Sequence, residues 1–278
     1  MINILLCGNE KVFDGALTEL ISITNNTKED INCYIFTANL TRINSNYTEI
    51  KDEQIEFLNS VVKSKNKNNE VQKVDVTEIY EKELGKCKNE NTSYTPYAML
   101  RLLADLVSNM PDKLLYLDID MMAAKDISEL YNIDITEYEY AAAKEFLGKF
   151  FVKWDYINSG VLLLNLKRIK ENKTFEKARE LIRNKKMVCV DQDALFKSTT
   201  KKLILPRIYN EQIRFNKKDT IICHFCKRLL FYPYPRIENY KQWQVDKVHK
   251  VLKCHTFDKD LDEYLEWKNK YENIKSSK

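Results

Sequence analysis

A short apolar strand that ends in two closely spaced carboxylates is the feature that most constrains this chain. Residues 114–117 read Leu-Leu-Tyr-Leu, a run typical of a strand buried on both faces of a sheet. Asp118 and Asp120 follow at its carboxyl end. Ligands of open α/β sheets bind at that edge, and two hard oxygen ligands suit a divalent cation that carries phosphates. The alternative is a strand that ends in acids because it has reached solvent.

The segments around this strand alternate as an α/β fold requires. Apolar runs at residues 2–7, 32–37 and 71–76 predict strands, and apolar residues at helical spacing after the first two predict helices. We therefore expect a mostly parallel central sheet flanked by helices. Gly8 lies in the first strand–helix turn, but the chain has no GxGxxG and no GxxxxGKS/T motif. These absences disfavour a dinucleotide site and a P-loop NTPase.

A helix is also predicted just before the central strand. Thr95 is suited to the N-cap and Pro96 to the first helical position. Arg101 falls outside the apolar stripe, so it either reaches elsewhere or forms an ion pair with Asp105, four residues later. The residues that share the expected buried face are Met99, Leu102, Leu103 and Leu106.

Three later stretches place polar side chains at the ends of predicted elements. Residues 158–160 read Asn-Ser-Gly and begin a strand, where they allow either close ligand approach or a β-bulge. Residues 191–193 read Asp-Gln-Asp and begin a helix, where they either cap the helix or face a cleft. His224 ends another strand and is followed by Cys226, Lys227 and Arg228.

Composition is that of an ordinary globular protein with enough apolar material for a core. The 278 residues are 44% hydrophobic and 31% charged, and the net charge of +4 does not call for nucleic acid. The seven cysteines are odd in number and scattered, which indicates reduced thiols. Without a signal-like N-terminus or a membrane-length apolar segment, we expect a cytoplasmic protein.

The last fifty residues carry the whole net charge. Residues 227–278 contain twelve Lys or Arg and eight Asp or Glu, which suits a solvated helical face or contact with an anionic membrane. Their apolar residues recur at helical spacing, so they either pack on the domain or form part of an acceptor site, and we favour packing. These residues are Tyr240, Trp243, Val245, Val248, Val251, Leu252, Leu261, Tyr264 and Leu265.

The order of the motifs resembles the family 8 glycosyltransferases, the group that contains glycogenin and bacterial lipopolysaccharide α-galactosyltransferases. The matching pieces are the opening strand and turn, Tyr-Ala-Met-Leu at 97–100, Leu-Tyr-Leu-Asp-Ile-Asp at 115–120, Asn-Ser-Gly-Val at 158–161, Asp-Gln-Asp-Ala-Leu at 191–195, and His224. The resemblance implies a GT-A catalytic domain at residues 1–226. Residues 227–278 would be a helical extension packed on it.

The resemblance further implies an enzyme that moves a hexose from a UDP-sugar, with retention and with Mn²⁺ or Mg²⁺. Asp118, Asp120 and His224 would ligate the metal, and Asp191 and Gln192 would act at the sugar. The acceptor would be a cell-surface glycan or a lipopolysaccharide-like molecule. Further residues implied to contact the donor are Cys7, Gly8, Asn9, Arg101, Asp118, Ile119, Glu145, Asn158, Ser159 and Lys227.

Several positions depart from the family pattern. Asn9 stands where relatives usually carry Asp, and Met99 where many carry Arg, a role that Arg101 would take over. The basic residue expected after His224 is represented by Lys227 or Arg228, and the sequence does not choose between them.

Two alternative functions stay open. The spacing of Cys223 and Cys226, with Cys254 further along, suits a zinc-binding module, although Cys223 and His224 are adjacent and would point to opposite faces of a strand. The altered first loop keeps open a catalytically silent protein that only binds a sugar nucleotide.

Overall fold

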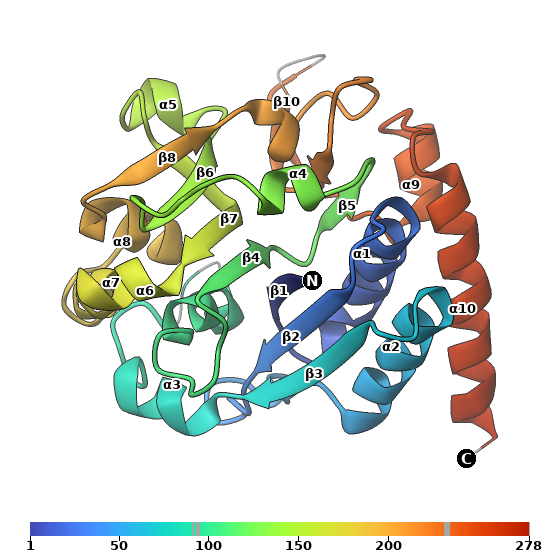
Figure 1. The fold of residues 1–278 in the computed structure, drawn as a ribbon, viewed down its shortest axis with the longest axis horizontal. Helices are drawn as coiled ribbons and strands as arrows, with labels where there is room; N and C mark the ends of the chain where they lie inside the picture. Colours follow the sequence, from blue (N-terminus) through green and yellow to red (C-terminus); the bar gives the residue numbers. More distant parts are fainter. Residues whose placement is uncertain (91, 93–94, 231–233, 278) are drawn as a thin grey trace.

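A computed structural model describes residues 1–90, 92, 95–230 and 234–277. Within these residues the main sheet has seven strands in the order β3-β2-β1-β4-β7-β6-β8 (Figure 1). β7 runs antiparallel to its neighbours β4 and β6, and the other adjacent pairs are parallel. In sheet order the strands are Glu70–Asp75, Ile31–Thr37, Ile2–Cys7, Lys113–Leu117, Ile157–Asn165, Tyr140–Lys144 and Lys202–Leu205. The mostly parallel sheet predicted from the sequence is confirmed.

Two small antiparallel pairs accompany this sheet. β5 (Met121–Ala123) pairs with β9 (Ile222–His224), and β10 (Arg228–Leu230) pairs with β11 (Arg236–Glu238). The β5–β9 pair matters for function, because it brings the end of β9 next to the segment that follows β4.

Helices cover both faces of the main sheet. On one face lie α1 (Phe13–Asn26), α2 (Asp52–Lys65) and the C-terminal α10 (Asp258–Ser276) (Figure 1). The elements that contribute to the other face are α3 (Thr77–Glu83), η2 (Pro96–Leu103), α6 (Leu166–Glu171), α7 (Thr174–Asn184) and α8 (Val190–Ser198). The remaining short helices are η1 (Glu10–Val12), α4 (Ser128–Tyr131), α5 (Gly148–Phe151), η3 (Arg207–Tyr209) and α9 (Val245–Lys250).

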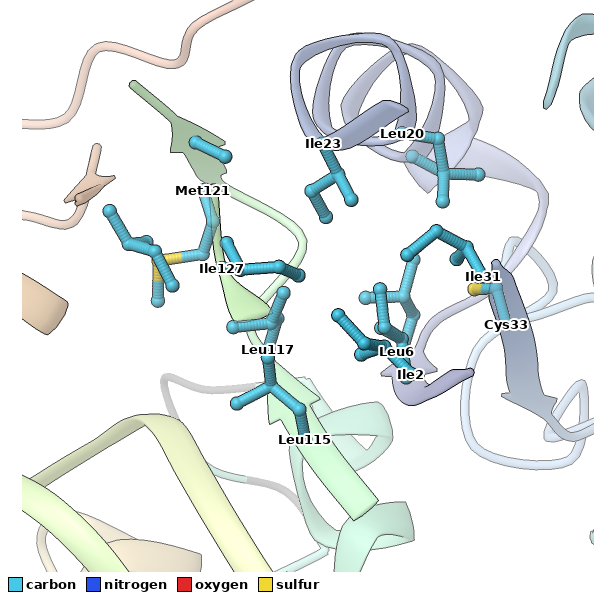
Figure 2. Close-up of a cluster of buried hydrophobic side chains, with 14 of the residues drawn as sticks. Ile2, Leu6, Leu20, Ile23, Ile31, Cys33, Leu115, Leu117, Met121 and Ile127 are labelled. Atoms are coloured by element: carbon cyan, nitrogen blue, oxygen red, sulfur yellow. The ribbon is translucent and has the colours of Figure 1, made fainter. Parts of the chain in front are cut away.

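The central strands are buried on both faces, as the apolar run at 114–117 predicts. Leu115 and Leu117 of β4 join the cluster under α1, whereas Leu114 and Tyr116 join the cluster on the opposite face. Figure 2 shows part of the first cluster, in which side chains of β1 and β4 meet Leu20 and Ile23 of α1. Alternate side chains of β4 thus stabilise two separate apolar layers.

Residues 96–103 form a 3₁₀ helix rather than the predicted α-helix. Because a 3₁₀ helix has about three residues per turn, its buried face differs from that of an α-helix. Leu106, expected to be buried, is 42% exposed, whereas Arg101 is only 3% exposed. Of the two alternatives for Arg101, the structure shows the one in which it reaches elsewhere: it pairs with Asp118, and Asp105 pairs with Arg179 at 2.6 Å.

The C-terminal helix α10 lies against α1 and α2. Tyr264 of α10 is buried and donates to Asp14 of α1 at 2.9 Å, and Trp267 lies edge-on to Phe57 of α2. Val251 and Leu265, expected in the packing faces, are instead exposed. No helix in the described part of the chain is both long and apolar enough to cross a membrane.

Candidate active site

Three strands of the main sheet bring polar side chains to one edge. β1 and β4 are parallel neighbours, so Cys7 and the Asp118–Asp120 segment emerge on the same side of the sheet. β7 is antiparallel to β4 and therefore begins at that edge with residues 157–160. The Asp118 amide donates to the Gly160 carbonyl at 2.8 Å, which ties the two ends together.

Asp118, Asp120 and His224 form a compact group of metal-ligating side chains. One ligand atom of each lies within 4.8 Å of the others, and Asp120 and His224 are buried. His224 Nε2 lies 3.2 Å from Asp120 Oδ1 and 3.7 Å from Asp118 Oδ2. Register explains the proximity, because Met121 of β5 pairs directly with His224 of β9. The predicted grouping of these three residues is therefore present in the fold.

Gly160 makes room for this histidine. A Cβ atom at residue 160 would lie 2.5 Å from His224 Cε1, which is far inside van der Waals contact. The small residues at the start of β7 thus serve close approach between two elements of the protein itself. The β-bulge reading also has support, because the β6–β7 register shifts here: Ala142 pairs with Leu162, whereas Lys144 pairs with Ile157.

An asparagine relay orients the His224 ring. The Asn210 amide nitrogen donates to Asn158 Oδ1 at 2.8 Å, so the Asn210 oxygen faces His224 Nδ1 at 3.1 Å. Nδ1 therefore carries a proton, and Nε2 is the ring nitrogen that faces the two carboxylates. Asn210 is fully buried, and sequence reasoning missed it because it lies in an irregular segment without a motif.

Arg101 is buried and forms an ion pair with Asp118. Its Nη2 donates to Asp118 Oδ1 at 2.8 Å and its Nη1 donates to the Ser159 carbonyl at 2.6 Å. The guanidinium also stacks 4.0 Å above the Tyr116 ring, whose hydroxyl donates to the same Asp118 oxygen at 2.6 Å. One Asp118 oxygen is therefore held by the protein, and the other is turned toward His224.

Asp191 and Gln192, at the start of α8, meet Ser159 across the same edge. Ser159 Oγ lies 3.2 Å from Asp191 Oδ2, and the Ser159 amide donates to Gln192 Oε1 at 3.0 Å. Burial raises the pKa of Asp191; the Arg101 charge lowers it and the Asp118 charge raises it further, so the net shift is upward. In this structure the Gln192 side-chain oxygen is turned to Ser159.

Lys241 is the basic residue that contacts Asp120. Its ammonium group is hydrogen-bonded to Asp120 Oδ2 and lies 3.3 Å from the Phe225 carbonyl. Burial raises the pKa of Asp120, but the charges of His224 and Lys241 lower it by more, so the net shift is downward. Sequence reasoning named Lys227 and Arg228 instead, and Arg228 stacks 4.6 Å from the Phe215 ring. The missed signal was a lysine between two aromatic residues, Tyr240 and Trp243.

Gln242 holds the segment that carries Lys241. It is fully buried, and its Nε2 donates to the Ile119 carbonyl at 3.0 Å. This bond joins the C-terminal extension to the residue between the two aspartates. The backbone carbonyl of Ile119 is therefore already hydrogen-bonded within the protein.

The first loop, Cys7 to Asn9, lies beside the candidate metal ligands, but its side chains contact neighbouring residues of the protein. Asn9 is buried, caps η1 by accepting from the Lys11 amide at 3.2 Å, and donates to the Asn46 carbonyl at 3.3 Å. A Cβ at Gly8 would lie 2.4 Å from Val12 Cγ2, so only glycine fits under that side chain. Burial raises the pKa of the Cys7 thiol, which keeps it neutral.

Two more acids belong to the surroundings of the site. Glu145 follows β6 and accepts a hydrogen bond from the Gly148 amide, which fixes the start of α5. Glu19 of α1 is fully buried, and both of its carboxylate oxygens lack hydrogen-bond partners among the described residues. Burial, followed by the charges of Asp120 and Asp118, raises the pKa of Glu19 well above its usual value. Sequence reasoning missed Glu19 because it lies inside an otherwise apolar helix.

The thiols do not assemble into a zinc site. Cys223 and Cys254 are buried in a small apolar cluster with Phe215 and Phe225. Among the described residues, the groups with metal-ligand proximity contain no cysteine. The zinc-binding alternative therefore loses its geometric support.

Comparison with known families identifies the kind of protein. A family model described as "Glycosyl transferase family 8" matches residues 3–246, which is most of the chain. The chain belongs to glycosyl transferase family 8. The resemblance seen in the motifs is thereby confirmed, and the match extends past residue 226, so it includes Lys241.

Among curated proteins, this family member is similar to a putative glycosyltransferase of Haemophilus influenzae. The two are 28% identical over 206 residues, which cover 66% of this chain and 60% of that protein. Glycosyltransferase GlyA of Streptococcus pneumoniae is 35% identical over 79 residues, which cover 28% of this chain and 11% of GlyA. The alignments thus span only part of the curated relatives.

Solved structures confirm the GT-A-like fold. An active-site mutant of LgtC superposes with a TM-score of 0.70 at 15% identity and covers 97% of this chain and 96% of that chain. The galactosyltransferase LgtC in complex with donor and acceptor sugar analogues gives a TM-score of 0.65, also at 15% identity, and covers 96% of this chain and 95% of that chain. At this identity the likeness establishes the fold, including the C-terminal helix.

Proposed function

We propose that this family 8 protein is a metal-dependent retaining glycosyltransferase that moves a hexose from a UDP-sugar to a glycan acceptor. The observation that carries the proposal is the convergence of Asp118, Asp120 and His224 at the carboxyl edge of the sheet. Two carboxylates and an imidazole with a fixed tautomer fit Mn²⁺ or Mg²⁺ better than a soft metal. A cation there would neutralise the charge that develops on UDP as the glycosidic bond breaks.

The protein's own cation supports a diphosphate at this position. Lys241 is paired with Asp120 in this structure. If Asp120 held a divalent cation, the Lys241 ammonium group would be free to contact the phosphates on the same side of the sheet. Lys241, rather than Lys227 or Arg228, is therefore our candidate for the phosphate-binding residue.

Arg101 has a positioning role in this proposal. Its two hydrogen bonds, to Asp118 and to the Ser159 carbonyl, link the metal-ligating strand to the strand that faces the sugar. It is too deeply buried to meet a phosphate directly. We infer that it keeps Asp118 aimed at the metal.

The sugar would lie between the starts of β7 and α8. Asn158, Ser159 and Asp191 supply the polar groups there, and Glu145 lies at the end of the neighbouring β6. Gln192 would act at the anomeric centre after its oxygen leaves Ser159, which costs the hydrogen bonds from the Ser159 amide and from Ser159 Oγ. Its neutral amide makes it a stabiliser of developing positive charge rather than a nucleophile. Cys7, Gly8 and Asn9 would border the nucleoside.

Hydrolysis of a panel of UDP-sugars, with and without Mn²⁺, tests this function. At least one donor should be cleaved only in the presence of the metal, and Asp120→Asn should weaken the response to Mn²⁺ sharply because it removes an anionic ligand. Asp262→Asn, on the exposed surface of α10, is the matched control. An equal response to Mn²⁺ in Asp120→Asn and the parent would refute the assignment.

A catalytically silent sugar-nucleotide-binding protein is the second candidate. It is favoured by Asn9, whose side chain is used for local hydrogen bonds rather than presented to a ligand. Calorimetry separates the two candidates. Metal-dependent UDP-sugar binding without any turnover, even with glycan acceptors added, would select the silent protein.

A further inference from the structure

The connection between β6 and β7 ends in a protruding apolar surface. Four side chains, which we name the aromatic tip, are mostly exposed: Phe150 (72%), Phe151 (83%), Val152 (60%) and Trp154 (73%). Three large apolar residues in succession, with a tryptophan two positions later, form more than a scattering of single exposed residues. Contiguous exposed apolar surface of this kind marks a site of interaction.

The base of this connection is held firmly by the domain. Tyr156 donates to Asp193 at 2.6 Å, and its ring packs edge-on against Phe196 of α8. On the other side, the Phe146 amide donates to Gln212 at 3.1 Å. The domain thus presents the aromatic tip outward from an anchored base.

Lysines surround the tip. Lys144 Nζ lies 2.9 Å from the centroid of the Trp154 ring, and Lys149 Nζ lies 4.9 Å from that of Phe150. Lys153 is also exposed and lies 3.7 Å from Asp155, so residues 144–155 contain three lysines and two acids, Glu145 and Asp155. Aromatic rings with ammonium groups at their margin suit the boundary between lipid headgroups and acyl chains. A site for a neutral glycan would not need this excess of positive charge.

We propose that the aromatic tip docks this protein on an anionic phospholipid surface. Phe150, Phe151 and Trp154 enter the headgroup region, while Lys149 and Lys153 contact lipid phosphates. The connection follows β6 at the same edge of the sheet as Asp118 and Asp120, so docking turns the candidate active site toward the membrane. Binding of the surface itself does not depend on the proposed glycosyl transfer.

Within the C-terminal extension, helix α10 is less suited to membrane contact. α10 packs along α1 on the side of the molecule away from α5 (Figure 1). Its first turn carries Asp258 and Asp260, and its exposed apolar residues Leu265 and Ile274 are nine positions apart. Acids would repel anionic headgroups, so we assign docking to the aromatic tip.

Flotation with lipid vesicles tests the proposal without any sugar donor. The intact protein should float with vesicles of phosphatidylcholine and phosphatidylglycerol, and much less with phosphatidylcholine alone. Phe150→Ser combined with Phe151→Ser should weaken vesicle binding at least about tenfold, since each phenyl ring loses its apolar transfer energy. Lys149→Gln and Lys153→Gln should each weaken binding about fivefold at low salt.

The matched control is Leu265→Ser combined with Ile274→Ser, which removes two exposed apolar side chains from α10. It should bind vesicles as the parent does. Thermal unfolding of all variants should be unchanged, because the replaced side chains are exposed. No binding of the parent to anionic vesicles would overturn the proposal. So would loss of binding in the α10 variant alone, or a tip variant that keeps vesicle binding but loses affinity for a soluble glycan.

Discussion

Glu19 makes the stability of this protein depend on pH in a way that one substitution should remove. Its carboxyl group is completely buried in α1, and no described residue hydrogen-bonds to either oxygen. Burial is the main cause of its raised pKa, and the nearby Asp120 and Asp118 add to it. Above pH 4.5 the unfolded chain therefore releases a proton that the native protein keeps.

The sign and size of the effect follow from this difference. Because the native state binds more protons, the free energy of unfolding falls as pH rises, by about 1.4 kcal/mol per pH unit for one group. The loss begins at the ordinary glutamate pKa of 4.5 and ends at the raised native value. Glu19→Gln has the same shape without the titration, so above pH 4.5 it should gain stability over the parent at about this rate per pH unit.

Urea unfolding followed by tryptophan fluorescence, at several pH values between 4.5 and 7.5, measures the effect. EDTA should be present, because a metal on the two aspartates would change their influence on Glu19. Glu56→Gln, at an exposed position of α2, is the control and should follow the parent at every pH. If Glu19→Gln and the parent keep a constant difference across this range, Glu19 is ionised in the native protein and the reasoning fails.

Three further predictions concern the site. Arg101→Met should lower the free energy of unfolding by about 3–5 kcal/mol, because it leaves the buried Asp191 and the partly buried Asp118 without their cationic partner; urea unfolding near parent stability would contradict this. Asn210→Ala should weaken Mn²⁺ binding by about 10–100-fold by releasing the His224 ring; unchanged calorimetric affinity would show that the relay is not needed. Gln192→Ala should lower turnover while donor affinity stays the same, because its interaction strengthens only in the transition state. Equal losses of kcat and of donor affinity would make Gln192 a ground-state binding residue.

The sequence by itself determined the framework of the site. The apolar run before Asp118 predicts a central strand, and the strand–helix alternation predicts a parallel sheet, so the aspartates had to lie at the ligand-binding edge. Both patterns are local, because they depend on which residues share a face of a strand or a helix. The order of the motifs added His224, Asp191 and Gln192, and the fold brings these residues to the same edge.

Only the tertiary structure decided which partners surround these residues. Arg101 reaches Asp118 because residues 96–103 wind as a 3₁₀ helix, a choice that apolar periodicity does not distinguish well from an α-helix. Lys241 meets Asp120 across 121 residues of sequence, and Asn210 meets His224 from an irregular segment. Such contacts depend on how distant segments pack, since nothing in the local sequence tells a buried polar side chain which charge it will face.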